Sequence, residues 1–183
     1  MKMKKNKIVA VFLFLQILLI GSVQARCDLE SFQFGISYEA LMSKLKLDNY
    51  YVRPKQKIND SEHQLNVSIE IVSAPGQKVC NSEKIFKDFP VEFLLIEDKL
   101  VEIKVIRLSK SPVLINWAEA IYGEKQNKPN SFYSKKPIAN WFWKNSNAMI
   151  IYSIEPYEDK VSELMIIQSL NHQNSFDKMA IEL

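Results

Sequence analysis

The sequence predicts an α+β domain, an antiparallel sheet of about six strands with two main helices packed on one face. Three observations lead to this fold class. Period-two alternation of apolar and polar residues recurs in short segments, two of them joined by a polar turn over 90–108. Two other segments, 38–47 and 112–122, repeat their apolar residues with helical spacing. With only 4 glycines and 2 cysteines, the chain is neither a glycine-rich nor a cysteine-rich scaffold.

Residues 1–25 have the three-part layout of a secretory signal peptide. Four lysines precede an apolar run over 8–20, and small residues follow it. The apolar run is shorter than the roughly 20 residues that a membrane span needs, which favours cleavage over an uncleaved anchor. Arg26 stands where lipid attachment to Cys27 would require a small residue. We therefore expect export to the periplasm or secretion beyond it, with no membrane span after cleavage.

Charge argues against nucleic acid as a partner. The whole chain has 24 basic and 21 acidic residues, a net charge of +3. Without residues 1–25, which hold four lysines and no acid, 20 basic and 21 acidic residues remain, a net charge of −1. Such a chain gives no electrostatic case for binding phosphates. The mature chain, residues 26–183, has the length of a single domain. It has two candidate halves, 26–110 and 111–170, and a loose tail over 171–183.

The first half contains one helix and about three strands. An entry segment over 27–34 forms either a short strand or an arm held by a disulfide. A helix (38–47), a strand (65–71), a helical turn (79–89) and a hairpin (90–108) follow it. Ser37 fits the N-cap of the helix, because a hydroxyl there accepts a hydrogen bond from an unpaired backbone N–H. The polar stretch 48–64 is expected to be an exposed loop around a short extended piece.

The second half also has one helix and about three strands, in the order helix, hairpin, strand, and its helix is the best-marked of the chain. Ser111 fits its N-cap, Pro112 its first position and Gly123 the residue after its end. A lysine-bearing loop over 124–137 follows. A second hairpin and a last strand complete the half, over 141–154 and 161–170. The two halves together predict two αβ-hairpin units.

Phe34-Gly35-Ile36-Ser37, followed by an amphipathic helix and a hairpin, resembles the opening of small envelope proteins such as the outer-membrane assembly factor BamE. The two-unit pattern is also similar to the tandem architecture of β-lactamase inhibitor proteins. Both are small exported proteins that bind other proteins without catalysis. The resemblance implies a non-catalytic protein-binding module of the bacterial envelope, either an assembly factor or an inhibitor. The chain lacks the lipobox of the first type, and no functional residue is carried over.

Two cysteines in an exported chain predict one disulfide, Cys27 to Cys80. It would close a loop of about fifty residues and stabilise the fold by about 4 kcal/mol at most. Two unpaired buried thiols are the alternative.

Motifs for metal, nucleotide or nucleophilic chemistry are absent from the sequence. His63 and His172 are about a hundred positions apart, each in a polar segment, and the four glycines do not form a phosphate-binding loop. We expect no metal and no cofactor. Whether the protein is an enzyme stays open, because a hydrolase site could be assembled from scattered residues such as either histidine.

The aromatic residues of the second hairpin form the candidate binding site. On an extended strand Trp141 and Trp143 share one face and Phe142 lies on the other, while Tyr152 lies on the returning strand. Exposed tryptophans are frequent hot spots of protein binding, so Trp141, Trp143 and Tyr152 are predicted to bind another protein. The alternative is that both tryptophans pack under the second helix, against its aromatic residues.

Overall fold

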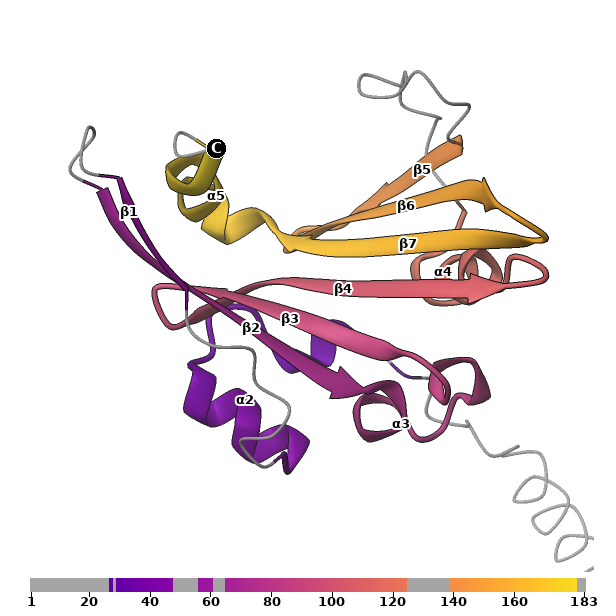
Figure 1. Cartoon of the computed structure of the whole chain (residues 1–183), viewed down its shortest axis with the longest axis horizontal. Coiled ribbons are helices and arrows are strands. Elements are labelled where there is room, and N and C mark those ends of the chain that lie inside the picture. The colour runs from indigo at the N-terminus through magenta and orange to yellow at the C-terminus, as the bar shows by residue number, and fades with distance from the viewer. Residues whose placement is uncertain (1–26, 28, 48–55, 61–64, 125–138, 181–183) are drawn as a thin grey trace, which may run out of the picture.

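The protein has an α+β fold built on one antiparallel sheet (Figure 1). The computed structural model describes residues 27, 29–47, 56–60, 65–124 and 139–180. Within these ranges, seven strands form the sheet in the order β1-β2-β3-β4-β7-β6-β5. The expected signal peptide (1–25), His63 and most of the loop expected over 124–137 lie outside the described residues.

The strands of the sheet are β1 (Gln56–Asp60), β2 (Leu65–Pro75), β3 (Pro90–Ile96), β4 (Lys99–Ser109), β5 (Ala139–Lys144), β6 (Ala148–Tyr157) and β7 (Lys160–Ser169). The α-helices are α2 (Tyr38–Leu45), α3 (Gly76–Val79), α4 (Leu114–Tyr122) and α5 (Gln173–Ala180). Three short 3-10 helices accompany them: η1 (Leu29–Phe32), η3 (Lys84–Phe86) and η4 (Leu170–His172). None of the helices in the described ranges has both the length and the apolar character that crossing a membrane would demand.

The hairpin predicted over 90–108 is formed by β3 and β4. Its turn residues Glu97 and Asp98 both have left-handed backbones, with φ of 51° and 61°, as a tight two-residue hairpin turn requires. The Asp98 carboxylate accepts a hydrogen bond from the backbone N–H of Tyr38 at 2.8 Å, and Ser37 Oγ accepts one from Ala40 at 3.3 Å. Ser37 is therefore the N-cap of α2, as predicted, and the hairpin turn fixes the start of the same helix.

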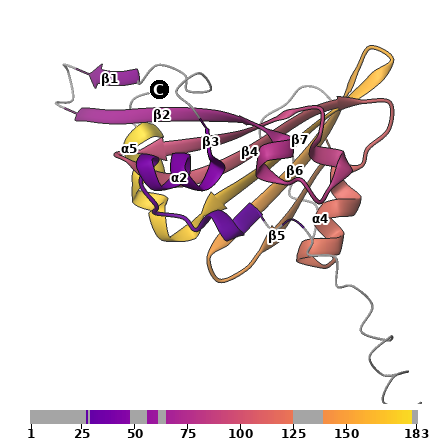
Figure 2. The same ribbon diagram turned by 90° about the horizontal axis from the view of Figure 1, so that it is seen from below.

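The main core lies between the sheet and the helices α2 and α4, which Figure 2 shows near opposite ends of the sheet. Phe93 and Phe32 are in ring contact at 5.0 Å, and Phe86 contacts Trp117 of α4 at 5.1 Å. The sheet contributes alternate residues of its central strands to this core, among them Val91, Phe93, Ile103, Val105, Ile150, Met165 and Ile167. This side of the sheet is called the helix side below.

A smaller core on the other side of the sheet involves the third helix of comparable length, α5. Phe176 of α5 packs with Ile96 and Val101 and with two residues of β2, Val67 and Ile69. The expectation of two main helices on one face, followed by a loose tail over 171–183, therefore needs correction. The tail contains α5, whose few apolar residues include one that is 91% buried, at 9% exposure.

Two further differences concern element boundaries. Residues 56–60, expected within an exposed loop, form the edge strand β1 and pair with 65–69 of β2, which adds a strand to the six expected. The second helix begins at Leu114, and its N-cap residue is Val113, whose side chain makes no capping hydrogen bond. Ser111 and Pro112 therefore precede the helix, and the group that caps it comes from elsewhere in the chain.

A disulfide joins Cys27 to Cys80, as predicted. The two Cα atoms are 5.6 Å apart, within the usual range for this bond. Both cysteines are buried in the main core, at 9% and 4% exposure. The bridge anchors the start of the described chain, just before η1, to the residue that follows α3.

Candidate functional site

The structure places two of the three predicted binding residues in the main core. Trp143 is 2% exposed and Tyr152 is 0% exposed, while Trp141 is half-buried and packs on Tyr152 with ring centroids 5.6 Å apart. All three lie on the helix side of the sheet. Trp143 therefore packs under the second helix, as in the alternative, whereas Trp141 packs on Tyr152 of β6.

Trp143 is fixed by α4. Its indole Nε1 donates a hydrogen bond to the carbonyl oxygen of Gly123 at 2.8 Å, and its ring lies 6.4 Å from that of Tyr122. Gly123 has a φ of 83°, a left-handed conformation that glycine adopts without strain. The end of α4 thus provides both the ring contact and the acceptor that bury Trp143.

Tyr152 takes part in a buried network around Glu163, which is 0% exposed. Glu163 Oε1 accepts hydrogen bonds from the backbone N–H groups of Val113 and Leu114 at 2.9 and 2.8 Å and from the Tyr152 hydroxyl at 2.9 Å. Ser109 Oγ donates to Oε2 at 3.4 Å. A carboxylate at this place accepts from backbone N–H groups that a helix start leaves unpaired. Its negative charge also interacts favourably with the positive end of the helix dipole.

The Tyr152 phenol is strongly perturbed by this environment. Burial, reinforced by the hydrogen bond to Glu163 and by its negative charge, raises the pKa of Tyr152 far above its usual value. A phenol held protonated in a closed core acts as a hydrogen-bond donor and not as a base. Glu163 is thus a capping group for α4 whose role is structural, and sequence spacing gave no sign of it because 49 positions separate it from Leu114.

A hydrolytic site finds little support around the histidine that the structure describes. His172 Nδ1 lies 2.8 Å from Ser169 Oγ, a Ser–His pair of the kind that nucleophilic catalysis uses. Ser169 is only 1% exposed, and no carboxylate among the described residues hydrogen-bonds to His172. The imidazole instead packs against Gly35, where an added Cβ would come within 3.2 Å of its ring. Within the described ranges, no group of three or more potential ligands could hold a metal ion.

The side of the sheet opposite α2 and α4 carries an apolar surface that the prediction did not single out. Ile106 and Leu108 of β4 are 46% and 51% exposed, the two large aliphatic side chains that are exposed among the residues whose burial is described. Half-buried apolar residues follow on β7, the neighbour of β4, and then on β6 and β5. We call this surface the open face and define it by Ile106, Leu108, Phe142, Ile151, Leu164 and Ile166.

The strand register makes the open face continuous. Ile166 of β7 pairs with Lys104 of β4 on one side and with Ile151 of β6 on the other, and Ile151 in turn pairs with Phe142 of β5. One row further along the strands, Ile106 pairs with Leu164. Residues directly opposite on adjacent strands have their side chains on the same side of a sheet. Helix α5 covers only the end of this side near β1 and β2 (Figure 1).

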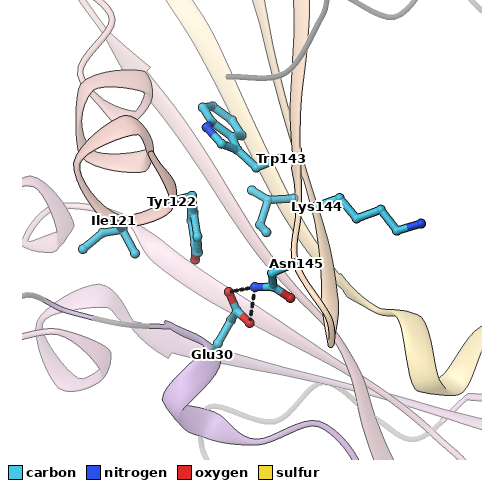
Figure 3. A pocket seen from close by; sticks show the side chains of 7 residues that line it. Glu30, Ile121, Tyr122, Trp143, Lys144 and Asn145 are labelled. Atoms are coloured by element: carbon cyan, nitrogen blue, oxygen red, sulfur yellow. Dashed lines mark hydrogen bonds between the residues drawn. The ribbon is translucent and has the colours of Figure 1, made fainter. Parts of the chain in front are cut away.

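A pocket of about 370 Å³ lies on the helix side at the tip of the β5–β6 hairpin (Figure 3). Ile121, Tyr122, Trp143 and Ile150 form its apolar walls. Glu30 of η1 lies at its rim, where the Asn145 side-chain amide donates to both carboxylate oxygens at 2.9 Å. Lys144 completes the lining, so polar and apolar groups contribute about equally. Glu30 and Asn145 are hydrogen-bonded to each other, and the apolar walls beside them suit a large apolar side chain.

Comparison with known proteins adds no relative: no family model, no curated protein and no solved structure matches this chain.

Proposed function

We propose that the protein is an exported, non-catalytic module that binds another protein through the open face, as an assembly factor or an inhibitor of the bacterial envelope does. The observation that carries this proposal is the exposure of Ile106 and Leu108 within a continuous apolar surface. Contiguous apolar surface on a folded chain marks sites of interaction. Complete burial of one such side chain is worth about 1.5–3 kcal/mol, so the two half-exposed ones leave about 2 kcal/mol for a partner to gain.

The sequence predicts a binding surface around Trp141 and Trp143, and the proposed surface lies on the opposite side of the same sheet. Phe142 takes the place of Trp141 and Trp143, because side chains alternate between the two sides of a strand. Trp143, buried on the other side, holds β5 against the end of α4 in a fixed orientation. A rigid sheet surface binds with a low entropic cost of ordering.

Export is supported by two independent features. The disulfide between Cys27 and Cys80 is of the kind that persists in oxidising compartments. The signal peptide predicted for residues 1–25 gives the route to such a compartment. Periplasmic and secreted destinations both fit, and the location of the partner distinguishes them.

The arrangement of strands also supports two αβ-hairpin units. α2 is followed by the strands β1-β2-β3-β4 and α4 by β5-β6-β7, so that β2-β3-β4 and β5-β6-β7 lie on either side of the β4–β7 contact and β1 is an addition to the first unit. The last hairpin of each unit turns at the same tripeptide, Glu97-Asp98-Lys99 and Glu158-Asp159-Lys160.

The test is chemical crosslinking in an envelope extract, with the oxidised mature chain as bait. The variant Ile106→Lys/Leu108→Lys adds two charges to the open face, and the matched control Ser111→Lys/Asn116→Lys adds the same charges at exposed positions near α4. We expect a partner that the wild type and the control capture and that the open-face variant loses. The free energy of unfolding of each bait, from urea titration, shows that all three are folded.

If the open-face variant captures the same proteins as the control, the proposed surface is wrong. The alternative function, a hydrolase, rests on the Ser169–His172 pair. It predicts an activity that His172→Ala removes without unfolding the chain, whereas the binding function leaves His172→Ala fully able to capture the partner.

A further inference from the structure

The two edges of the sheet differ in how they are protected. Edge strands expose unpaired backbone groups, and proteins shield them with charges, prolines or very short strands. β1 has five residues and includes Lys57 and Asp60. β5, at the other edge, has the sequence Ala-Asn-Trp-Phe-Trp-Lys, with no proline, no acid and its only charge at Lys144. In the described part of the chain β5 has a neighbour on one side, β6.

The hydrogen bonds of the hairpin show which backbone groups of β5 point outward. The N–H of Asn145 donates to the carbonyl oxygen of Ala148 at 3.0 Å, which closes the turn. Hydrogen-bonded and non-hydrogen-bonded pairs alternate along an antiparallel ladder. Trp143 and Trp141 therefore exchange hydrogen bonds with β6, and the N–H and C=O groups of Phe142 and Lys144 point away from it. Neither residue has a hydrogen bond to a further segment among those the structure describes.

The pocket lies beside this edge. Trp143, which forms one of its walls, precedes Lys144 on β5 and faces the helix side. In Figure 3 the Lys144 side chain extends away from Trp143 and Tyr122. A strand added outside β5 would place the residue opposite Trp143 on the helix side, next to the pocket. The residues opposite Phe142 and Lys144 would lie on the side of the open face.

We propose that β5 accepts an extended segment of another polypeptide as an additional antiparallel strand. The segment carries, from its N-terminus, an acidic residue opposite Lys144, a large apolar residue opposite Trp143 that enters the pocket, and an apolar residue opposite Phe142. Main-chain hydrogen bonds to an edge provide affinity, while alternate side chains provide specificity. This site shares Phe142 with the open face, but Ile106 and Leu108 lie three strands away on β4, so different variants test the two proposals.

A second copy of the chain fits this edge less well. If two β5 strands paired about Phe142, the residue opposite Trp143 would be Trp141 of the other copy. Trp141 packs on Tyr152 of its own chain, with ring centroids 5.6 Å apart, and is not available to fill the pocket. The charges argue the same way, because Lys144 has no acid on β5 to pair with.

The experiment selects a random heptapeptide phage library on the oxidised mature protein and measures the enriched peptides, dye-labelled, by fluorescence anisotropy. Two variants test the edge. Phe142→Pro removes the ring and the outward N–H, and Phe142→Thr removes the ring alone. We expect enrichment of the acidic–apolar–apolar order, and an affinity about fivefold weaker for Phe142→Pro than for Phe142→Thr, the effect of one lost hydrogen bond.

A charge exchange gives a second test that leaves the strand intact. Lys144→Glu should weaken binding of the acidic peptide about threefold, and replacing the acid by lysine in the peptide should restore it. This arm decides the proposal if Phe142→Pro does not fold. The absence of enriched peptides, or equal affinities across the variants, overturns the proposal. A dimer in sedimentation experiments that Lys144→Glu alters would assign the edge to a second copy and overturn it too. Retained peptide binding by Ile106→Lys/Leu108→Lys keeps this result distinct from that for the open face.

Discussion

Replacement of Glu163 tests whether one buried carboxylate holds α4 to the sheet. Its Oε1 accepts from Val113, Leu114 and Tyr152 at 2.8–2.9 Å. Glu163→Ala leaves these three donors without a partner in the core, at about 1–3 kcal/mol each before relaxation. We therefore expect a loss of about 3–5 kcal/mol in the free energy of unfolding. At about 2–4 °C per kcal/mol for a domain of this size, the melting temperature should fall by about 10 °C.

Glu163→Gln separates the role of the acceptor from that of the charge. Its amide oxygen can still accept from the same three donors, so we expect a smaller loss of about 1–2 kcal/mol. Asp159→Ala, at an exposed turn, is the control and should change stability by about 0.5 kcal/mol or less. Urea unfolding followed by tryptophan emission reports the change, because Trp117 and Trp143 are buried. Equal losses for the alanine and glutamine variants, or losses under about 1 kcal/mol for both, would refute the capping role.

Three further predictions concern the rest of the fold. Because the pKa of Tyr152 is raised, the folded chain keeps a phenol proton that the unfolded chain loses above pH 10, and stability should fall by up to about 1.4 kcal/mol per pH unit there. Tyr152→Phe should remove this part of the slope in urea titrations from pH 8 to about 11, and an unchanged slope would contradict it. Mass spectrometry should find the exported protein two hydrogens lighter than the reduced chain, and two thiols that react with an alkylating agent before reduction would contradict the disulfide. Cys27→Ser/Cys80→Ser should lower the free energy of unfolding by up to about 4 kcal/mol. Phe176→Ala should cost about 3 kcal/mol, because α5 packs through this ring, whereas a loose tail would show no loss.

The sequence predicts elements well where local signals agree. The turn at Glu97-Asp98 and the N-cap at Ser37 follow from residue types alone, and both are present. The start of the second helix is later than expected, because its cap is Glu163, and no local pattern connects residues so far apart. The helix α5 was missed for a related reason. Its apolar residues are few and come late in the segment, and Phe176 docks on a second core that no local pattern reveals.

The candidate site was harder to predict because the strands of the second hairpin do not alternate. Trp141, Phe142 and Trp143 are all apolar, as are Ile150, Ile151 and Tyr152. A polar-apolar alternation tells which side of a strand is buried, and a shift by one residue exchanges the two sides. Without that signal, sequence alone could not decide whether the tryptophans or Phe142 face the helices. The position of Trp143 is decided by its hydrogen bond to Gly123, a contact between distant segments.

The missing alternation is itself informative once the layers of the fold are known. A strand covered on both sides has apolar residues throughout, as in sheets that lie between two layers. β7 has this character over Leu164-Met165-Ile166-Ile167, yet α2 and α4 cover one side, and α5 reaches only one end of the other. The strands β5, β6 and β7 are therefore more apolar than their own helices require. A second layer that the described residues do not supply explains the excess, and a protein partner on the open face is the layer that we propose.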